Sequence, residues 1–262
     1  MRKLIYIFVL IFLYYSGAIK FVYAQDGRIP DYIGEKLEYS IFYSFIRAGT
    51  ASMSFQEDSL SENYYIKMDS RTVGVANTLY RIRDIYECTM DPLTGYPIKA
   101  IRNIREGRYR AYNEVEYDHQ IREDSTVVNS QKSGVAVVPK EIYDILSAFY
   151  LLRKKCISES LQLGDTIFIK TYFTDEVFDL NIRYMGKEKV KTEFGKTICH
   201  KFNPVTEVGR AFKTEEDMTI WFTDDSNFLP VKVHLDLRVG SVRVELVDFS
   251  GLKYESQLSF KK

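Results

Sequence analysis

The chain has 262 residues, and its 36 lysines and arginines balance its 36 aspartates and glutamates. This balance argues against a nucleic-acid-binding protein, which normally carries a clear basic excess. Three cysteines are too few for a disulfide scaffold. Cys88, Cys156 and Cys199 leave two alternatives, either one disulfide in any of three pairings or three buried thiols that act as small apolar groups.

The first 24 residues have the layout of a secretory signal. Arg2 and Lys3 precede an uncharged run over residues 4–15, and the segment ends in Ala24. The uncharged run is shorter than the ~18–20 residues that cross a bilayer. We therefore expect a signal peptide over residues 1–24 that is cleaved after Ala24, and a periplasmic protein with one β-rich domain over residues 25–262 and no transmembrane span. An uncleaved N-terminal anchor is the alternative.

Most of the chain after this segment alternates apolar and polar residues, which is typical of strands with one buried and one solvated face. The first predicted strand places four large side chains on one face: Tyr39, Ile41, Tyr43 and Phe45. Ala48-Gly49 is expected to interrupt it before a return strand over residues 50–56. Further strands are predicted over residues 64–72, 84–90, 96–105, 108–118 and 121–128. A turn is predicted over residues 91–95, because Pro92 fixes φ and Gly95 tolerates a positive φ.

One segment has helical periodicity instead. Within residues 141–155, five apolar side chains recur at helical spacing and form one stripe: Ile142, Ile145, Leu146, Phe149 and Leu152. Asp144 and Arg153 are interpreted as helix-end charges that suit the helix dipole. A loop over residues 129–140, with the small apolar run Val135–Val138, is expected to precede this helix. A shorter helical turn is predicted over residues 75–81.

The C-terminal part of the chain predicts three more strands. Residues 218–223 alternate, residues 224–227 form a loop, and residues 231–239 and 242–246 form a hairpin about Gly240-Ser241. One helix among many strands indicates a mainly β fold. We predict a curved antiparallel sheet or open β-barrel with one main α-helix packed against it.

Four sequence stretches carry a resemblance to a known family. They are residues 34–39 (GEKLEY) with Ala48-Gly49, residues 144–153 (DILSAFYLLR), residues 220–225 (IWFTDD) with 229–231 (LPV), and residues 239–242 (VGSV) with 245–246 (EL). In their order and spacing they resemble the periplasmic proteins of domain of unknown function 3108. This resemblance implies an exported, β-rich protein and supplies no catalytic residue. The overall plan is also similar to open, helix-plugged half-barrels that carry lipids or lipoproteins across the periplasm, although a fold does not fix a function.

No motif for catalysis or metal binding stands out. The sequence contains no paired His or Cys at zinc-ligand spacing, no nucleophile elbow, no phosphate loop and no dinucleotide-binding glycine pattern. His200 follows Cys199 directly, and neighbours on a strand point to opposite faces. Asp224-Asp225 is interpreted as a turn rather than a cation site. We therefore predict no catalytic residue, no metal and no cofactor, and a protein that is not an enzyme.

Two features are candidates for ligand binding. Arg102, Arg105, Arg108 and Arg110 form an arginine series, with Arg81 and Arg83 upstream. Arg102, Arg108 and Arg110 share even-numbered positions, although a turn at Gly107 intervenes, and such a cluster is suited to bind an anionic headgroup or glycan. The alternative is a solvated strand face. The helical stripe Ile142, Ile145, Leu146, Phe149 and Leu152 is the second candidate, as the wall of a cavity that an acyl chain enters. The alternative for the stripe is ordinary core packing.

These observations favour a non-enzymatic binder or carrier of an apolar or amphipathic, lipid-like molecule of the cell envelope. An interaction or assembly module for envelope proteins or glycans, without a small ligand, is the alternative. A hydrolase that acts on glycans or esters is a third hypothesis. It requires two carboxylates in a groove or a Ser–His pair within hydrogen-bond reach. Nucleic acid is not expected as a partner.

Overall fold

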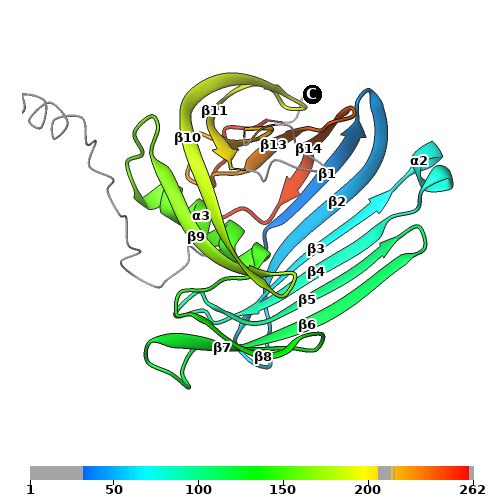
Figure 1. Cartoon of the computed structure of the whole chain (residues 1–262). Helices are drawn as coiled ribbons and strands as arrows, with labels where there is room; N and C mark the ends of the chain where they lie inside the picture. Colours follow the sequence, from blue (N-terminus) through cyan, green and yellow to red (C-terminus); the bar gives the residue numbers. More distant parts are fainter. Residues whose placement is uncertain (1–31, 206–213, 215, 260–262) are drawn as a thin grey trace, which may run out of the picture.

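In the part of the chain that the structure describes, fourteen strands form one continuous antiparallel sheet that curls into an open, barrel-like shape (Figure 1). The computed structural model describes residues 32–205, 214 and 216–259. The predicted signal peptide and its cleavage after Ala24 lie outside the described residues. The mainly β class predicted from the sequence, with a curved sheet and one main helix, is confirmed.

The elements follow one another along the chain in a long meander. The first half contains β1 (Lys36–Tyr43), β2 (Ile46–Glu57), β3 (Tyr64–Thr72), α2 (Gly74–Leu79), β4 (Arg83–Met90), β5 (Pro97–Glu106), β6 (Tyr109–Asp118), β7 (Ser125–Ser130) and β8 (Gly134–Pro139). The second half contains α3 (Ile145–Ser158), β9 (Thr166–Phe173), β10 (Glu176–Thr192), β11 (Gly195–Pro204), β12 (Met218–Thr223), β13 (Pro230–Asp236) and β14 (Ser241–Ser250). Among the described residues, no helix is long and apolar enough to cross a membrane.

The first and last strands of the chain pair with each other in the middle of the sheet. Its order is β8-β7-β6-β5-β4-β3-β2-β1-β14-β13-β12-β11-β10-β9, so β1 pairs with β14, and β8 and β9 are the edges. The segment between β8 and α3 covers part of the β9 edge. Tyr143 N donates to Lys170 O at 3.0 Å, and Tyr172 N donates to Tyr143 O at 2.8 Å. Such cover satisfies backbone groups that an edge strand otherwise exposes.

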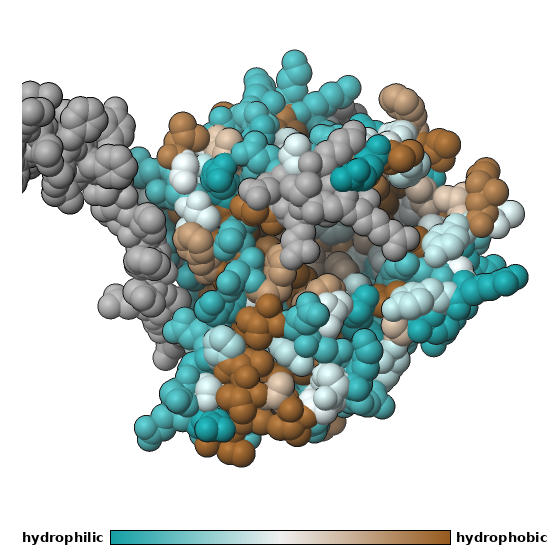
Figure 2. All heavy atoms as spheres, in the orientation of Figure 1, coloured by the Kyte–Doolittle hydropathy of each residue, from teal (hydrophilic) through white to brown (hydrophobic). Residues whose placement is uncertain are grey.

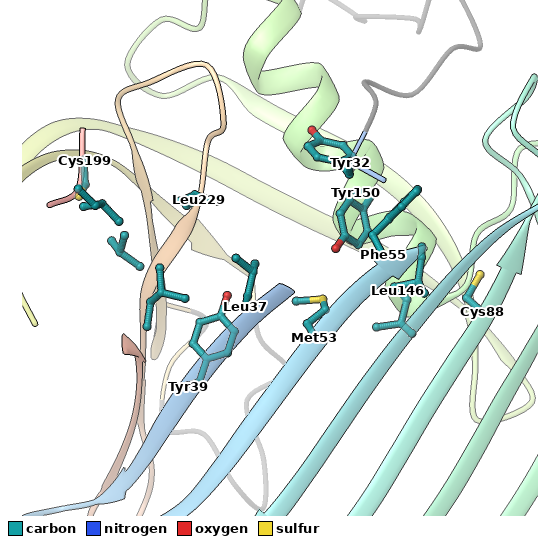
Figure 3. Close-up of a cluster of buried hydrophobic side chains, with 14 of the residues drawn as sticks. Tyr32, Leu37, Tyr39, Met53, Phe55, Cys88, Leu146, Tyr150, Cys199 and Leu229 are labelled. Carbon is teal, nitrogen blue, oxygen red and sulfur yellow. The ribbon is translucent and has the colours of Figure 1, made fainter. Parts of the chain in front are cut away.

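Helix α3 lies inside the curved sheet and contacts both halves of it. Asp144 caps its N-terminus by accepting hydrogen bonds from Leu146 N at 2.9 Å and Ser147 N at 3.0 Å, which confirms Asp144 as a helix-end charge. Leu146 and Tyr150 belong to a buried cluster with side chains of β1–β4 (Figure 3). The opposite side of the helix packs against a second cluster from β9–β12. The helix is therefore enclosed rather than laid on one surface.

Arg153 is buried, so its interpretation as a helix-end charge is wrong. Its guanidinium binds the Glu35 carboxylate through two hydrogen bonds, of 2.6 and 2.7 Å, and donates to Asn227 O at 2.8 Å. It lies 4.3 Å from the centroid of the Tyr32 ring, and both charged side chains are almost fully buried, at 0% and 3% exposed. These contacts join β1, α3 and the β12–β13 loop, which carry three of the four stretches that resemble the family.

The position of the first hairpin turn differs from the prediction. The first hairpin turns at Ser44-Phe45, where Ser44 has a φ of 53° and Phe45 is 96% exposed, rather than at Ala48-Gly49. Gly49 lies within β2, where a Cβ atom would be 2.7 Å from the Arg71 carbonyl oxygen. This glycine therefore permits a close approach of two strands and does not form a turn.

The segment before the helix is also a strand rather than a loop. Residues 134–139 form β8, which pairs with β7 from Ser130↔Gly134 to Ser125↔Pro139. The predicted strand over residues 121–128 begins only at Ser125, and Ile121 is 65% exposed. The short apolar run Val135–Val138 did not predict a strand, because a run of this length is compatible with more than one kind of secondary structure.

All three cysteines are buried free thiols. Burial raises the pKa of Cys199 to about 12 and raises the pKa values of Cys88 and Cys156 above their ordinary range. Of the two alternatives, the structure therefore shows three buried thiols. A thiol with a raised pKa is a poor nucleophile at neutral pH, because the thiolate is the reactive form.

Candidate functional site

A cavity of about 340 Å³ lies between the inner face of β4–β6, the start of α3 and the β9–β10 turn. Its lining combines apolar side chains with polar and charged ones. The strands contribute Tyr86, Ala100, Arg102, Tyr109, Ala111, Asn113, Val115 and Tyr117, and the other side contributes Lys132, Asp144, Ile145, Tyr172, Phe173, Thr174 and Asp175. Ligand pockets typically combine such an apolar wall with a few polar groups.

Strand register aims these side chains into the cavity. Tyr86 pairs with Arg102, and Arg102 pairs with Asn113, so the three side chains form one row on the same face of the sheet. Directly opposed residues in antiparallel strands share a face. Ala100 and Ala111 lie in neighbouring rows of this face, and their small side chains leave the space that a larger residue would fill.

Arg102 is the main charged group in the cavity. Its guanidinium lies 5.3 Å from the centroid of the Phe173 ring, and its Nε is buried and donates no hydrogen bond within the described residues. Burial raises the pKa of Tyr86, while a hydrogen bond with Arg102 opposes that increase. Arg102 forms no salt bridge within the described residues. A buried donor without a partner costs about 1–3 kcal/mol, so this side chain is suited to an added anion.

Both carboxylates that line the cavity already have partners. Asp144 caps α3, and Asp175 accepts hydrogen bonds from three side chains across the opening of the sheet. Lys132 lies 3.5 Å from Asp175. Within the described residues, Arg102 and Arg110 are the cationic lining residues that form no salt bridge, and Arg110 already donates to two backbone carbonyl oxygens. The positive charge most available to a ligand in the cavity is therefore that of Arg102.

The β9–β10 turn is held in place by Asp175. Asn113 Nδ2, Ser130 Oγ and Ser133 Oγ donate to Asp175 Oδ1 at 3.0, 2.5 and 2.9 Å. Thr174 and Asp175 have φ values of 53° and 67°, which are unfavourable for residues other than glycine, asparagine and aspartate. These hydrogen bonds offset the strain, so the turn stays against β6 and β7 and closes one side of the cavity.

Replacement of Asp175 by asparagine is expected to make stability less dependent on pH. Partial burial raises the pKa of Asp175, but the hydrogen bonds from Ser130, Ser133 and Asn113 outweigh it and lower the pKa overall. A lowered carboxyl pKa adds stability that is complete above about pH 4 and is lost as the pH falls through the lowered value. The difference in melting temperature between parent and Asp175→Asn should therefore be largest at pH 5–7 and shrink below about pH 4.

Thermal melts from pH 7 to pH 3 measure this difference. Asp179→Asn is the matched control, because it makes the same chemical change in an exposed ion pair with Lys170, which should contribute little. A difference between parent and Asp175→Asn that stays constant over the whole pH range would contradict the assigned role.

The predicted helical stripe contributes one residue to the cavity lining. Ile145 lines the cavity. Ile142, Leu146 and Leu152 are buried in the core, and Phe149 packs edge-to-face on Tyr150 at 5.4 Å between ring centroids. Four members of the stripe thus contact other core residues, as the alternative of ordinary core packing describes.

The predicted arginine series is divided between two faces of the sheet. Arg102 points into the cavity. Arg110 pairs with Arg105 on the outer face and donates to the carbonyl oxygens of Gly107 and Tyr109. Arg110 also contacts the edge of the cavity. Arg108 is exposed in the β5–β6 turn. Because of the β5–β6 turn, even-numbered residues face inward on β5 and odd-numbered residues face inward on β6. The even numbering that these arginines share therefore did not place them on one face.

Several lining residues were not predicted. Tyr86 and Asn113 share the inner face with Arg102, and alternation along β4 and β6 was sufficient to find them. Tyr172 and Phe173 come from the opposite edge of the sheet, and Lys132 comes from the β7–β8 turn. No local pattern indicated these contacts, because they depend on how far the sheet curls.

The described histidines lie next to aromatic and acidic side chains. Within the described residues, no group of three or more His, Cys, Asp or Glu side chains is placed to hold a metal ion. His200 Nε2 lies 2.9 Å from Asp224 Oδ1, and its Nδ1 lies 3.0 Å from the Tyr184 hydroxyl. Asp225 accepts hydrogen bonds from the backbone of Asn227 and Phe228, which confirms its role in a turn.

Comparison with solved structures supports the fold. The chain is similar to a beta-barrel-like protein of domain of unknown function DUF1849 from Brucella abortus, with a TM-score of 0.58 and 12% identity over 87% of this chain and 100% of that chain. At this identity the similarity shows the fold alone. A DUF1089 family protein from Pseudomonas aeruginosa has a TM-score of 0.29 at 10% identity, over 80% of this chain and 94% of that chain, which does not indicate a shared fold.

Comparison of the sequence identifies the family. No curated protein matches the chain significantly. A family model described as a protein of unknown function (DUF3108) matches residues 38–247, which is most of the chain. This match confirms the resemblance seen in the four stretches around Glu35, α3, the β12–β13 loop and the last hairpin. The chain belongs to the DUF3108 family.

Proposed function

We propose that this protein is exported to the periplasm and there binds or carries, without catalysis, a small amphipathic anion with an apolar tail. The observation that carries this proposal is Arg102, whose buried Nε lacks a partner within the described residues and faces a cavity of about 340 Å³. The signal-like layout of residues 1–24 supports export.

The volume and lining of the cavity favour a ligand with a single apolar chain. Ligand pockets usually have volumes of about 300–1,000 Å³, and this cavity is near the lower limit. Ala100, Ile145 and Tyr172 offer apolar surface for a tail, while Arg102 offers a charge-assisted hydrogen bond to a carboxylate or phosphate head. Charge-assisted hydrogen bonds are about twice as strong as neutral ones, so the head group should dominate recognition.

Binding of decanoate and decanol tests this proposal, because the two probes differ in their head groups. Isothermal titration calorimetry should show decanoate bound at least about tenfold more tightly than decanol, since hydrogen bonds to charged groups contribute about 1.5–3 kcal/mol. Arg102→Gln should remove this preference, and Arg110→Gln should retain it because that guanidinium is bound to backbone carbonyls.

Two outcomes of the titration would argue against the proposal. One is that the parent protein binds neither probe. The other is that Arg102→Gln prefers decanoate as strongly as the parent does, which would place the anion elsewhere.

An interaction module without a small ligand is a second candidate, and the edge strand β8 favours it. Val135 and Val137 on β8 are 71% and 55% exposed, and Figure 2 shows a brown surface in the lower part of the molecule, where Figure 1 places β7 and β8. An exposed apolar edge strand is suited to pair with another chain. A protein that binds neither probe but captures an envelope protein through β8 would support this candidate instead.

A further inference from the structure

Four neighbouring chain connections lie at one end of the sheet, and we call the surface that they form the basic rim. It consists of residues 43–48, 71–83, 105–110 and 237–241, which include the β1–β2 turn, α2, the β5–β6 turn and the β13–β14 turn. In Figure 1, α2 and the β1–β2 turn lie at the upper right end of the long strands. The rim adjoins the cavity at Tyr109 and Arg110 and otherwise consists of residues outside the cavity lining.

Hydrogen bonds make these connections neighbours. The pairs are Tyr43 Oη to Val239 O at 2.9 Å, Val73 N to Ala48 O at 2.9 Å, and Gly107 N to Arg81 O at 2.7 Å. The Tyr80 ring also lies so close to Gly107 that a Cβ atom there would be 2.6 Å from it. Segments that are far apart in the sequence therefore form one continuous surface.

Large apolar side chains project from the rim into solvent. The exposed fractions are 96% for Phe45, 63% for Ile46, 71% for Val75, 80% for Leu79 and 75% for Val239. Figure 2 shows separate brown side chains projecting at the upper right, where Figure 1 places the β1–β2 turn and α2. Single exposed apolar residues are ordinary on protein surfaces, but several on adjoining connections mark an interaction surface.

The rim is strongly basic although the whole chain is neutral. Its four segments contain eight arginines, no lysine and one acidic residue. The arginines are Arg47, Arg71, Arg81, Arg83, Arg105, Arg108, Arg110 and Arg238. The acidic residue, Glu106, is partly buried beside Asp84, and its burial raises its pKa. The rim therefore presents almost purely positive charge.

Three of these arginines surround a groove on the outer face of the sheet. Arg71 is directly opposite Arg83, and both line a groove of about 240 Å³ together with Arg105. The groove contains one carboxylate, Asp69, and none of the three arginines forms a salt bridge within the described residues. Like charges directly opposite one another destabilise a sheet, so an external anion would stabilise this arrangement. Guanidinium groups bind phosphate oxygens in pairs.

We propose that the basic rim docks on the surface of an anionic lipid bilayer. The arginines bind headgroup phosphates, and the apolar tips enter the boundary between headgroups and acyl chains. This combination of basic and apolar side chains is the pattern of proteins that lie on a membrane surface. Tyr109 and Arg110 belong to the rim and also line the cavity, so docking places the cavity beside the headgroups.

A soluble polyanion explains fewer of these observations than a bilayer does. A polyanion would contact the arginines but would leave Phe45 and Leu79 in water. A bilayer accommodates both kinds of side chain at once, since its anionic surface lies directly above an apolar layer. Insertion of Phe45 is therefore the property that distinguishes the two partners.

A fluorescent label at Phe45 measures insertion directly. Because Cys88, Cys156 and Cys199 are buried, a cysteine introduced by Phe45→Cys in the full chain can be labelled alone with an environment-sensitive dye. Leu60→Cys is the matched control, because Leu60 is 94% exposed in the connection at the opposite end of β2. Vesicles of phosphatidylcholine are compared with vesicles that also contain phosphatidylglycerol.

We expect a blue shift of the label at residue 45 with phosphatidylglycerol vesicles, and none with phosphatidylcholine or for the label at residue 60. Replacing Arg71, Arg83 and Arg105 together by glutamine should weaken vesicle binding about a hundredfold. Replacing the exposed Lys189, Lys191 and Lys196 by glutamine removes the same charge and should leave the shift unchanged.

Three results would overturn the proposal. They are no shift at residue 45, an equal shift at residues 45 and 60, or a shift that survives the triple arginine replacement. Binding to dextran sulfate that depends on the arginines, without any shift at residue 45 on vesicles, would identify a polyanion surface instead of a membrane surface.

Discussion

Replacement of Arg153 by methionine is expected to destabilise the protein by about 3–5 kcal/mol, because it leaves the buried carboxylate of Glu35 without its counterion. Glu35 would keep one hydrogen bond, from the Tyr150 hydroxyl at 3.1 Å. Asn227 O would also lose its guanidinium donor. Equilibrium unfolding in urea measures the free energy of unfolding of parent and variant.

Two further variants make this prediction specific. Glu35→Leu combined with Arg153→Met replaces the whole pair by apolar side chains, and it should regain most of the loss because no buried charge remains. Arg183→Met breaks an exposed ion pair with Glu216 and should cost less than about 1 kcal/mol. A loss for Arg153→Met as small as that for Arg183→Met would show that the buried pair does not hold the three elements together.

Replacement of Ala111 by tryptophan is expected to weaken decanoate binding at least about tenfold, because the ring would fill space that a ligand tail needs. Ala111 lines the cavity and pairs with the buried Ile104 on the inner face of the sheet. Titration calorimetry measures the affinity. Overpacking typically costs about 1–3 kcal/mol, so a thermal melt establishes whether the variant is folded.

Glu116→Trp is the matched control for the cavity. Glu116 lies on the outer face of the same strand, opposite Lys99, and is exposed. It should bind decanoate like the parent. If Ala111→Trp is folded and also binds like the parent, the cavity is not the binding site. If Ala111→Trp does not fold, Arg102→Gln tests the same cavity without adding volume.

The sequence predicted the strands whose two faces differ strongly. The predicted strand over residues 64–72 coincides with β3, and the strands near β4, β5 and β6 were placed within one or two residues. In these strands the inner face is mostly apolar, apart from residues such as Arg102 and Asn113, and the outer face is mostly polar, so alternation is visible locally. The turn at residues 91–95 followed from the same local chemistry, with Asp91 accepting hydrogen bonds from Leu93 N and Thr94 N.

Strands β9–β11 were not predicted, and for β10 the reason is physical. Most side chains of β10 are exposed on both faces, and few of them are buried. A register irregularity between Tyr184 and Lys187 also shifts the alternation in the middle of this strand. Neither a continuous period of two nor a helical period was therefore present.

The candidate site was predictable only in part. Arg102 was found as a member of the arginine series, and Ile145 from the helical stripe. The division of the arginines between two faces was not found, because it depends on the β5–β6 turn. The burial of Arg153 was not found either, because its partner Glu35 is 118 residues away in the sequence. A charged residue late in a helix has the same local appearance whether it is exposed or paired.

The most direct test of the proposed binding function is native mass spectrometry of the protein purified gently from its own cell envelope, followed by organic extraction. We expect a bound species of defined mass in the parent protein, lost on extraction and depleted in Arg102→Gln. A parent protein that shows only the mass of the unliganded chain, under several conditions without detergent, would contradict the binding function and direct the search to protein partners.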